Sequence, residues 1–145
     1  MEYPTARMLG GRRTLRRSVS SEIQLAGMVR EGLPSQALDH VLAELTPESA
    51  SQAEVYGVVG SARTLQRKRT AGTRLSPDES DRLARLARIL ARAEEALGDA
   101  GKARRWLGQS NFTLGGVKPL VLLDSDAGTL AVEQLLGQIE HGIIS

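Results

Sequence analysis

Cysteine is absent from this chain of 145 residues, and aromatic side chains are scarce. Without a thiolate there is no disulfide framework and no cysteine-ligated metal site, which agrees with a reducing cytoplasm, where we expect the protein. One tryptophan, one phenylalanine and two tyrosines cannot fill a core, so packing must rest on leucine, valine, isoleucine and alanine. Leucine and alanine are good helix formers, and their abundance favours a helical fold.

Long apolar runs are also missing. No segment approaches the roughly 18 consecutive apolar residues of a membrane-spanning helix, and the arginines near the N-terminus are not followed by the apolar segment of a secretory signal. We therefore expect no membrane contact. A chain of this length holds one domain or two small ones, and each half alone would be only marginally stable. Oligomerisation is therefore expected.

Sequence signatures of catalysis are absent as well. No nucleophile stands in a recognised pattern with a histidine and an acid, and the chain has no cluster of metal-ligating residues. The paired glycines at 10–11 and 115–116 lack the spacing and the lysine of a phosphate-binding loop. We predict that the protein is not an enzyme and binds no cofactor and no metal. A small enzyme is the least favoured interpretation.

Charge is distributed unevenly although the net charge is only +2. Residues 1–21 carry five arginines against one acid, and residues 60–75 carry five basic residues and no acid. Residues 119–145 carry four acids and no lysine or arginine. A chain that is basic at its front and middle and acidic at its end suggests two partners of opposite character.

Apolar spacing and capping residues predict an all-α fold. Residues 1–20 have few large apolar groups and are expected to be a basic flexible tail, either without a role or acting as an arm that contacts phosphates. Arg85, Arg88 and Arg92 of the long helix after Ser76-Pro77 are expected to form a solvated face, and Arg82 is expected to pair with Asp78 or Glu79 by helical spacing. The expected helices span about residues 22–31, 35–45, 47–59, 62–71, 77–97, 99–108 and 127–141, with a helical turn at 120–123.

A tight turn at Gly60-Ser61 followed by a basic helix has the form of a helix-turn-helix. In that motif the first residues of the second helix face the bases of the major groove, and basic residues further along neutralise phosphates. In many such motifs the turn glycine lies one residue earlier than Gly60, which makes a base-reading role less secure than a phosphate role. The alternative is a basic, solvated helix end. The DNA-contacting candidates are Ser61, Arg63, Thr64, Arg67, Lys68 and Arg69.

Spaced motifs run through residues 60–145. They are Ser76-Pro77-Asp78-Glu79 with Arg85-Leu86-Ala87-Arg88, Ala103 to Leu107, Asn111, Leu114-Gly115-Gly116, Pro119-Leu120, Gly128, Val132 and Ile139-Glu140-His141-Gly142. Together they resemble the linker helix and C-terminal domain of the Xre/MbcA/ParS antitoxins. Ser110 is a departure, because many relatives have proline there.

The resemblance implies an antitoxin of a type II toxin–antitoxin pair. The implied partner is a RES-domain toxin, a class that consumes NAD or transfers a group from it. The antitoxin silences this toxin by covering its active site. The helical N-terminal domain represses the shared operon by binding operator DNA, and dimerisation is usual. The resemblance thus implies two domains. They are a helix-turn-helix domain at 21–75, and a dimerisation helix with a toxin-binding domain at 76–145. The toxin-binding candidates are Asn111, Leu114, Gly115, Gly116, Asp124, Asp126, Glu140 and His141.

The acidic end of the chain supports this interpretation independently. A RES toxin binds an anionic dinucleotide and needs a basic pocket, which an acidic, leucine-rich surface complements. The alternative from a different functional class is a stand-alone helix-turn-helix regulator whose C-terminal domain only dimerises or senses a ligand.

Overall fold

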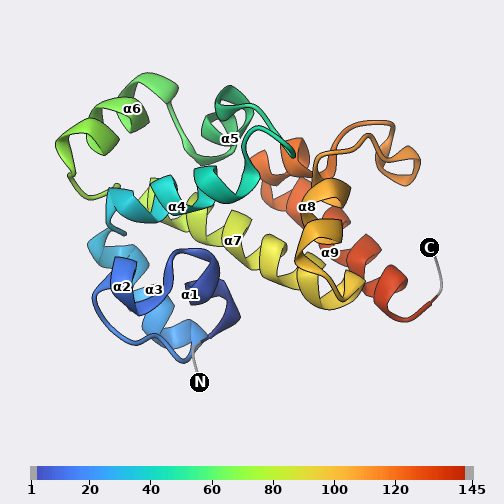
Figure 1. Ribbon diagram of the computed structural model, residues 1–145, viewed down its shortest axis with the longest axis horizontal. Coiled ribbons are helices and arrows are strands. Elements are labelled where there is room, and N and C mark those ends of the chain that lie inside the picture. The colour runs from blue at the N-terminus through green and yellow to red at the C-terminus, as the bar shows by residue number, and fades with distance from the viewer. Residues whose placement is uncertain (1–2, 143–145) are drawn as a thin grey trace.

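A computed structural model describes residues 3–142, which form helices joined by short loops (Figure 1). This confirms the all-α prediction. In chain order the α-helices are α1 (Pro4–Met8), α2 (Gly11–Leu15), α3 (Glu22–Glu31), α4 (Ser35–Leu45), α5 (Gln52–Val59), α6 (Ala62–Ala71), α7 (Pro77–Leu97), α8 (Ala100–Leu107) and α9 (Asp126–Glu140). Two short 3-10 helices, η1 (Phe112–Leu114) and η2 (Pro119–Asp124), lie between α8 and α9.

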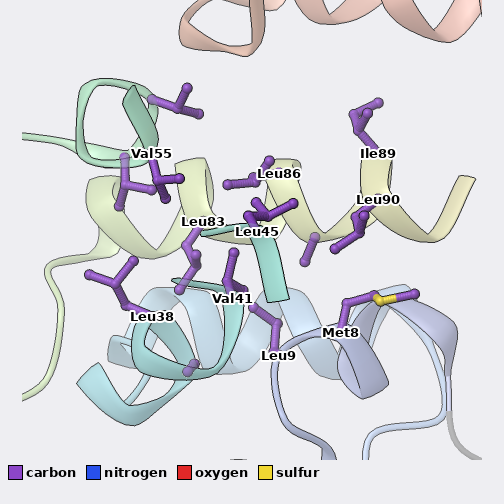
Figure 2. Packing of buried hydrophobic residues seen from close by; sticks show 14 of the residues in the cluster. Met8, Leu9, Leu38, Val41, Leu45, Val55, Leu83, Leu86, Ile89 and Leu90 are labelled. Carbon is purple, nitrogen blue, oxygen red and sulfur yellow. The ribbon is translucent and has the colours of Figure 1, made fainter. Parts of the chain in front are cut away.

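Helix α7 runs through the middle of the molecule, with α1 and α3 on one side and α8 and α9 on the other (Figure 1). Ser76 and Glu79 form a capping box at its start, and Gly98 ends the helix at φ 73°. Leu83 and Leu90 point towards the N-terminal helices, whereas Ile89 points to the opposite side (Figure 2). The helix is therefore buried on two sides.

The N-terminal segment differs from its prediction. In place of a flexible tail, residues 3–20 form α1 and α2, and the backbone N–H of Tyr3 donates to the carbonyl of Val19 over 3.0 Å. Ala6 and Leu9 are fully buried, and Leu15 is 4% exposed. These few apolar side chains are enough to hold the segment in place because they reach the core formed by α4 and α7. The first two residues of the predicted tail, and residues 143–145 of the predicted C-terminal domain, lie outside the described residues.

The start of α5 is a second difference. Thr46-Pro47-Glu48 was expected to begin this helix, but the Thr46 hydroxyl donates to the carbonyl of Leu42 over 2.6 Å and closes α4. A turn follows, and α5 begins only at Gln52, after a capping box formed by Ser51 and Glu54. A helix that started at Pro47 would displace Ser49, whose buried hydroxyl donates to the carbonyl of Arg104 in α8 over 2.7 Å.

A partly buried ion pair fixes α6 to α7. Glu79 Oε1 accepts hydrogen bonds from Lys68 Nζ over 2.6 Å and from the backbone N–H of Ser76 over 2.8 Å. Burial opposes ionisation of Glu79, but the hydrogen bonds from Lys68 and from Ser76 outweigh it, so that the pKa of Glu79 is lowered. The capping carboxylate of α7 thus also holds the basic helix before it.

The entry to α9 depends on a glycine. The backbone N–H of Gly128 donates to the Ser125 hydroxyl, which caps the helix, over 3.0 Å. A Cβ on Gly128 would lie 1.9 Å from the carbonyl oxygen of Leu122. The first turn of α9 therefore packs directly against the backbone of η2.

Replacing Glu79 with glutamine keeps the shape of the side chain and removes its charge. We expect a loss of about 1.5–3 kcal/mol of unfolding free energy at pH 7, the usual value for a hydrogen bond to a charged group. Because the folded-state pKa is lowered, this stabilisation is fully present above the ordinary value of 4.5 and is lost as the pH falls through the folded-state value. The gap between wild type and variant in urea unfolding should therefore shrink on acidification.

Glu48→Gln is the matched control for that measurement, since Glu48 is exposed and makes no ion pair within residues 3–142. It should change the unfolding free energy by less than about 0.5 kcal/mol. A gap for Glu79→Gln that did not vary with pH would contradict the role given to the carboxylate.

Two glycines of α9 should respond to alanine in opposite directions. Gly128→Ala forces a Cβ into the Leu122 carbonyl and should cost about 1–3 kcal/mol, as overpacking does. Gly137→Ala, on the same helix, meets only the Arg92 side chain at 4.0 Å and should stabilise by about 0.5–1 kcal/mol. Thermal unfolding of both variants checks this, and equal effects would mean that η2 does not pack on α9 as described.

Candidate functional site

Helices α5 and α6 form a helix-turn-helix with a two-residue turn, Gly60 and Ser61. Helix α6 lies at one end of the long axis of the molecule (Figure 1). Leu65, which is fully buried, is the side chain of α6 that enters the core, and Gly72 ends the helix at φ 70°. The outer face of α6 is therefore free to meet another molecule.

The outward residues of α6 match the leading end predicted for a recognition helix. Ser61, Arg63 and Arg67 are exposed, and Thr64 is half-buried. Within residues 3–142, neither Arg63 nor Arg67 has a carboxylate at ion-pair distance. Ser61 occupies the N-cap position, but its hydroxyl accepts no hydrogen bond from the helix backbone. Its side chain is thus not committed to the fold.

Lys68 and Arg69, two of the predicted phosphate contacts, instead have partners within the chain. Lys68 is bound to Glu79 of α7, as described above. Arg69 Nε donates to Asp39 of α4 over 2.5 Å, and its Nη1 donates to the Tyr56 hydroxyl over 2.5 Å. These contacts lock the rear of α6 to three other helices. The sequence pattern could not separate the two roles, because every partner lies on a different element.

A rigid loop between α8 and η2 contains the first group of toxin-binding candidates. The backbone N–H of Asn111 donates to the carbonyl of Val117 over 3.0 Å, and the N–H of Gly116 donates to the carbonyl of Asn111 over 2.8 Å. Gly115 and Gly116 both have left-handed backbones, at φ 82° and 85°, which side-chain-bearing residues rarely adopt. Asn111 and the glycines therefore shape the loop. Leu114 is half-buried and packs against the core.

Phe112 at the tip of this loop is a candidate that the sequence analysis missed. It is the only phenylalanine of the chain, and 97% of its surface is exposed. Val117 beside it is 39% exposed. The ion pair of Lys118 with Glu54, over 3.1 Å, fixes the base of the loop to α5. A large apolar group held outward on a fixed loop is typical of a protein-binding anchor.

Two of the three acidic candidates, Asp126 and Glu140, are paired with arginines of α7. Asp126 accepts from Arg85, and Glu140 Oε1 accepts from Arg92 over 2.8 Å. Glu133 lies between them on α9 and reaches Arg88 over 3.3 Å. The expectation of a solvated face is therefore wrong for Arg85, Arg88 and Arg92, whereas the expected ion pair of Arg82 with Asp78 forms at 3.4 Å. The hydrogen bond from Arg92 lowers the pKa of Glu140, which keeps this pair ionised.

The acidic surface is accordingly smaller than the sequence suggested. Asp124 is exposed and makes no ion pair among the described residues. Asp126 begins α9 and Glu140 ends it, which places them about 21 Å apart at 1.5 Å per residue. His141 is exposed just after α9, and the C-terminal end of that helix lies at the opposite end of the molecule from α6 (Figure 1). The candidates thus form two regions and not one patch.

Residues 3–142 contain neither a candidate membrane span nor a candidate metal site. No helix there is long and apolar enough to cross a bilayer. No group of three or more histidine, aspartate or glutamate side chains is placed to hold a metal ion.

Family models match both parts of the chain. The antitoxin Xre-like helix-turn-helix domain matches residues 24–88, and the antitoxin Xre/MbcA/ParS C-terminal toxin-binding domain matches residues 92–142. The first match extends into α7, so this helix contributes to both parts. Helices α1 and α2 precede both matches.

Curated relatives agree with these matches. An antitoxin Xre from Photorhabdus laumondii is 33% identical over 127 residues, which cover 87% of this chain and 84% of that protein. One from Yersinia enterocolitica is 38% identical over 99 residues, 67% of each chain. A Prs ADP-ribosylating antitoxin from a Sphingobium species is 25% identical over 132 residues, 85% of this chain and 82% of that protein. The chain therefore belongs to the Xre/MbcA/ParS family of antitoxins, with a helix-turn-helix domain followed by a toxin-binding domain.

Proposed function

We propose that this antitoxin represses its own operon by placing α6 in the major groove of operator DNA, and that it neutralises a RES-domain toxin by covering the active site of that toxin. The observation that carries the first half is the division of charge on α6. Its outward arginines are unpaired within the described residues, while its inward basic residues are tied to α4, α5 and α7.

The roles on DNA follow from position along α6. Ser61, Arg63 and Thr64 stand at the start of the helix, where side chains meet base edges in a helix-turn-helix. Arg67 lies one turn further and would neutralise a phosphate. Lys68 and Arg69 act from behind by holding the helix rigid. We propose that two copies bind together, because a dimer presents two recognition helices to two half-sites.

The apolar faces of α7 cannot form the dimer interface, since the chain covers them itself. A dimer formed through α7, the dimerisation helix expected from the sequence, would therefore use the exposed side of that helix. Sedimentation of the protein at several concentrations tests whether a dimer forms.

The toxin-binding half rests on the loop at 111–117. Phe112 offers an exposed apolar anchor that a partner would desolvate, on a backbone already held by hydrogen bonds, so that little conformational entropy is lost on binding. Leu114 supports the loop from the core side, and Asn111 with the two glycines sets its shape. Asp124 and His141 contribute polar contacts at the margins. Asp126 and Glu140 serve mainly to hold α9 on α7.

A RES-type partner is supported by chemistry and not by contact geometry. An NAD-consuming toxin needs a basic pocket for the pyrophosphate, and Asp124 is an unpaired acid of the described C-terminal region that suits such a pocket. One relative carries ADP-ribosylating in its name, and NAD is the usual donor of ADP-ribose.

Two arginines of α6 should affect DNA binding differently. Arg63→Ala should weaken binding to the operator by about 1–3 kcal/mol and relax its specificity, whereas Arg67→Ala should weaken binding to every duplex alike. Arg105→Ala, on the exposed side of α8, is the control and should change neither. Titration of an operator duplex and a random duplex across a salt series measures this. If the wild-type protein showed no salt-dependent binding, the repressor proposal would be wrong.

Truncating Phe112 to alanine should weaken toxin binding by about 2 kcal/mol or more, the cost of losing a hot-spot anchor. The control is Ile23→Ala, since Ile23 is 85% exposed but lies on α3. Co-expression with the toxin encoded beside the antitoxin gene gives the readout: wild type and Ile23→Ala should restore growth, and Phe112→Ala should do so poorly. Failure of the wild type to bind or neutralise that toxin would favour the stand-alone regulator.

A further inference from the structure

Helix α2 and the two residues that follow it present a cluster of arginines that precedes both family matches. Arg12, Arg13, Arg16 and Arg17 are all exposed, while Gly11 and Leu15 face the core. The proposed function leaves this cluster unused. Because residues 3–20 are folded onto α4 and α7, the arginines belong to the folded domain and not to a flexible tail.

Most of this charge is not neutralised within residues 3–142. Arg17 reaches Glu31 at 3.5 Å, with both side chains 55% exposed. Arg12, Arg13 and Arg16 have no carboxylate at ion-pair distance in that part of the chain, and the sequence has no acid between residues 3 and 21. Arg16 also has a left-handed backbone at φ 64°, the single non-glycine case found there. Such a conformation costs free energy, and here it is kept in the middle of the cluster.

The cluster lies on the same side of the molecule as α6. Helix α4 contacts both α2 and α6. On α4, Asp39 pairs with Arg69 of α6, whereas His40 lines a pocket together with Gly11 of α2 and with Ala100 and Arg104 of α8. Figure 1 shows α2 and α6 at one end of the long axis, away from the loop at 111–117 and from the end of α9. Two basic surfaces therefore flank α4.

We propose that α2 is a second DNA-contacting surface, which binds backbone phosphates of the same duplex that receives α6. A duplex is much longer than a single recognition helix, and its phosphates flank the groove in which that helix lies. Arginines at a fixed position beside the groove release counterions from these phosphates and add affinity without reading sequence. The proposal rests on DNA binding by α6, and it assigns a role to a segment outside the family's helix-turn-helix match.

The test compares two variants that each remove two charges. Arg12→Gln/Arg13→Gln alters α2 but leaves the strained Arg16 in place. Lys102→Gln/Arg105→Gln alters two exposed basic residues of α8 that have no ion pair within residues 3–142. Each full-length protein is titrated with a duplex from its own promoter and with a random duplex, between 50 and 200 mM salt, and thermal unfolding confirms that both variants fold.

The α2 variant should bind both duplexes more weakly by a common factor. Loss of two phosphate contacts lowers the magnitude of the slope of log K against log salt by about 1.8. The factor by which affinity falls between 50 and 200 mM salt should therefore be about tenfold smaller for the variant than for the wild type. The α8 variant should retain the wild-type slope.

Two results would overturn the proposal while leaving the repressor function intact. In one, the α2 variant keeps the wild-type slope although Arg67→Ala weakens binding. In the other, the α2 and α8 variants lose affinity equally, which would assign the effect to net charge and not to contact. Absence of DNA binding by the wild type would instead remove the proposed function itself.

Discussion

Burial of α7 on two opposite sides is the constraint on which the rest of this structure depends. Leu83 and Leu90 point towards the N-terminal helices, and Ile89 points towards the side of α8 and α9 (Figure 2). Removing either set of contacts would expose apolar surface of α7 to water, which is energetically unfavourable. The helix-turn-helix and the toxin-binding domain are therefore built on one common helix, which fixes the distance and orientation between their surfaces.

Ion pairs then determine which charges remain available to partners. Arg85, Arg88 and Arg92 hold the acids of α9, and Arg69 holds Asp39 of α4. Several of these pairs are partly screened by water and contribute modestly to stability. Their larger consequence is to remove acidic charge from the C-terminal surface and to leave the basic charge of α2 and of the outer face of α6 unpaired within residues 3–142.

The two proposed surfaces lie at opposite ends of the long axis (Figure 1). A duplex at α6 and α2 would not overlap a toxin at the loop that carries Phe112. Binding of both partners by one copy is thus sterically compatible. Each surface is also supported from behind by contacts that do not involve its partner, through Lys68 and Glu79 at α6 and through Lys118 and Glu54 at the loop.

Local signals in the sequence determined the all-α fold, the start of α7 at Ser76-Pro77, its stop at Gly98 and the exposed start of α6, because capping and helical periodicity act over a few residues. The tertiary structure decided the rest. Arg85 and Asp126 are 41 residues apart, and nothing local indicates that they meet. The apolar residues of α1 and α2 are too few to predict helices until α4 and α7 offer them a core. Likewise, only the fold distinguishes Arg67, which faces outward, from Arg69, whose partners come from α4 and α5.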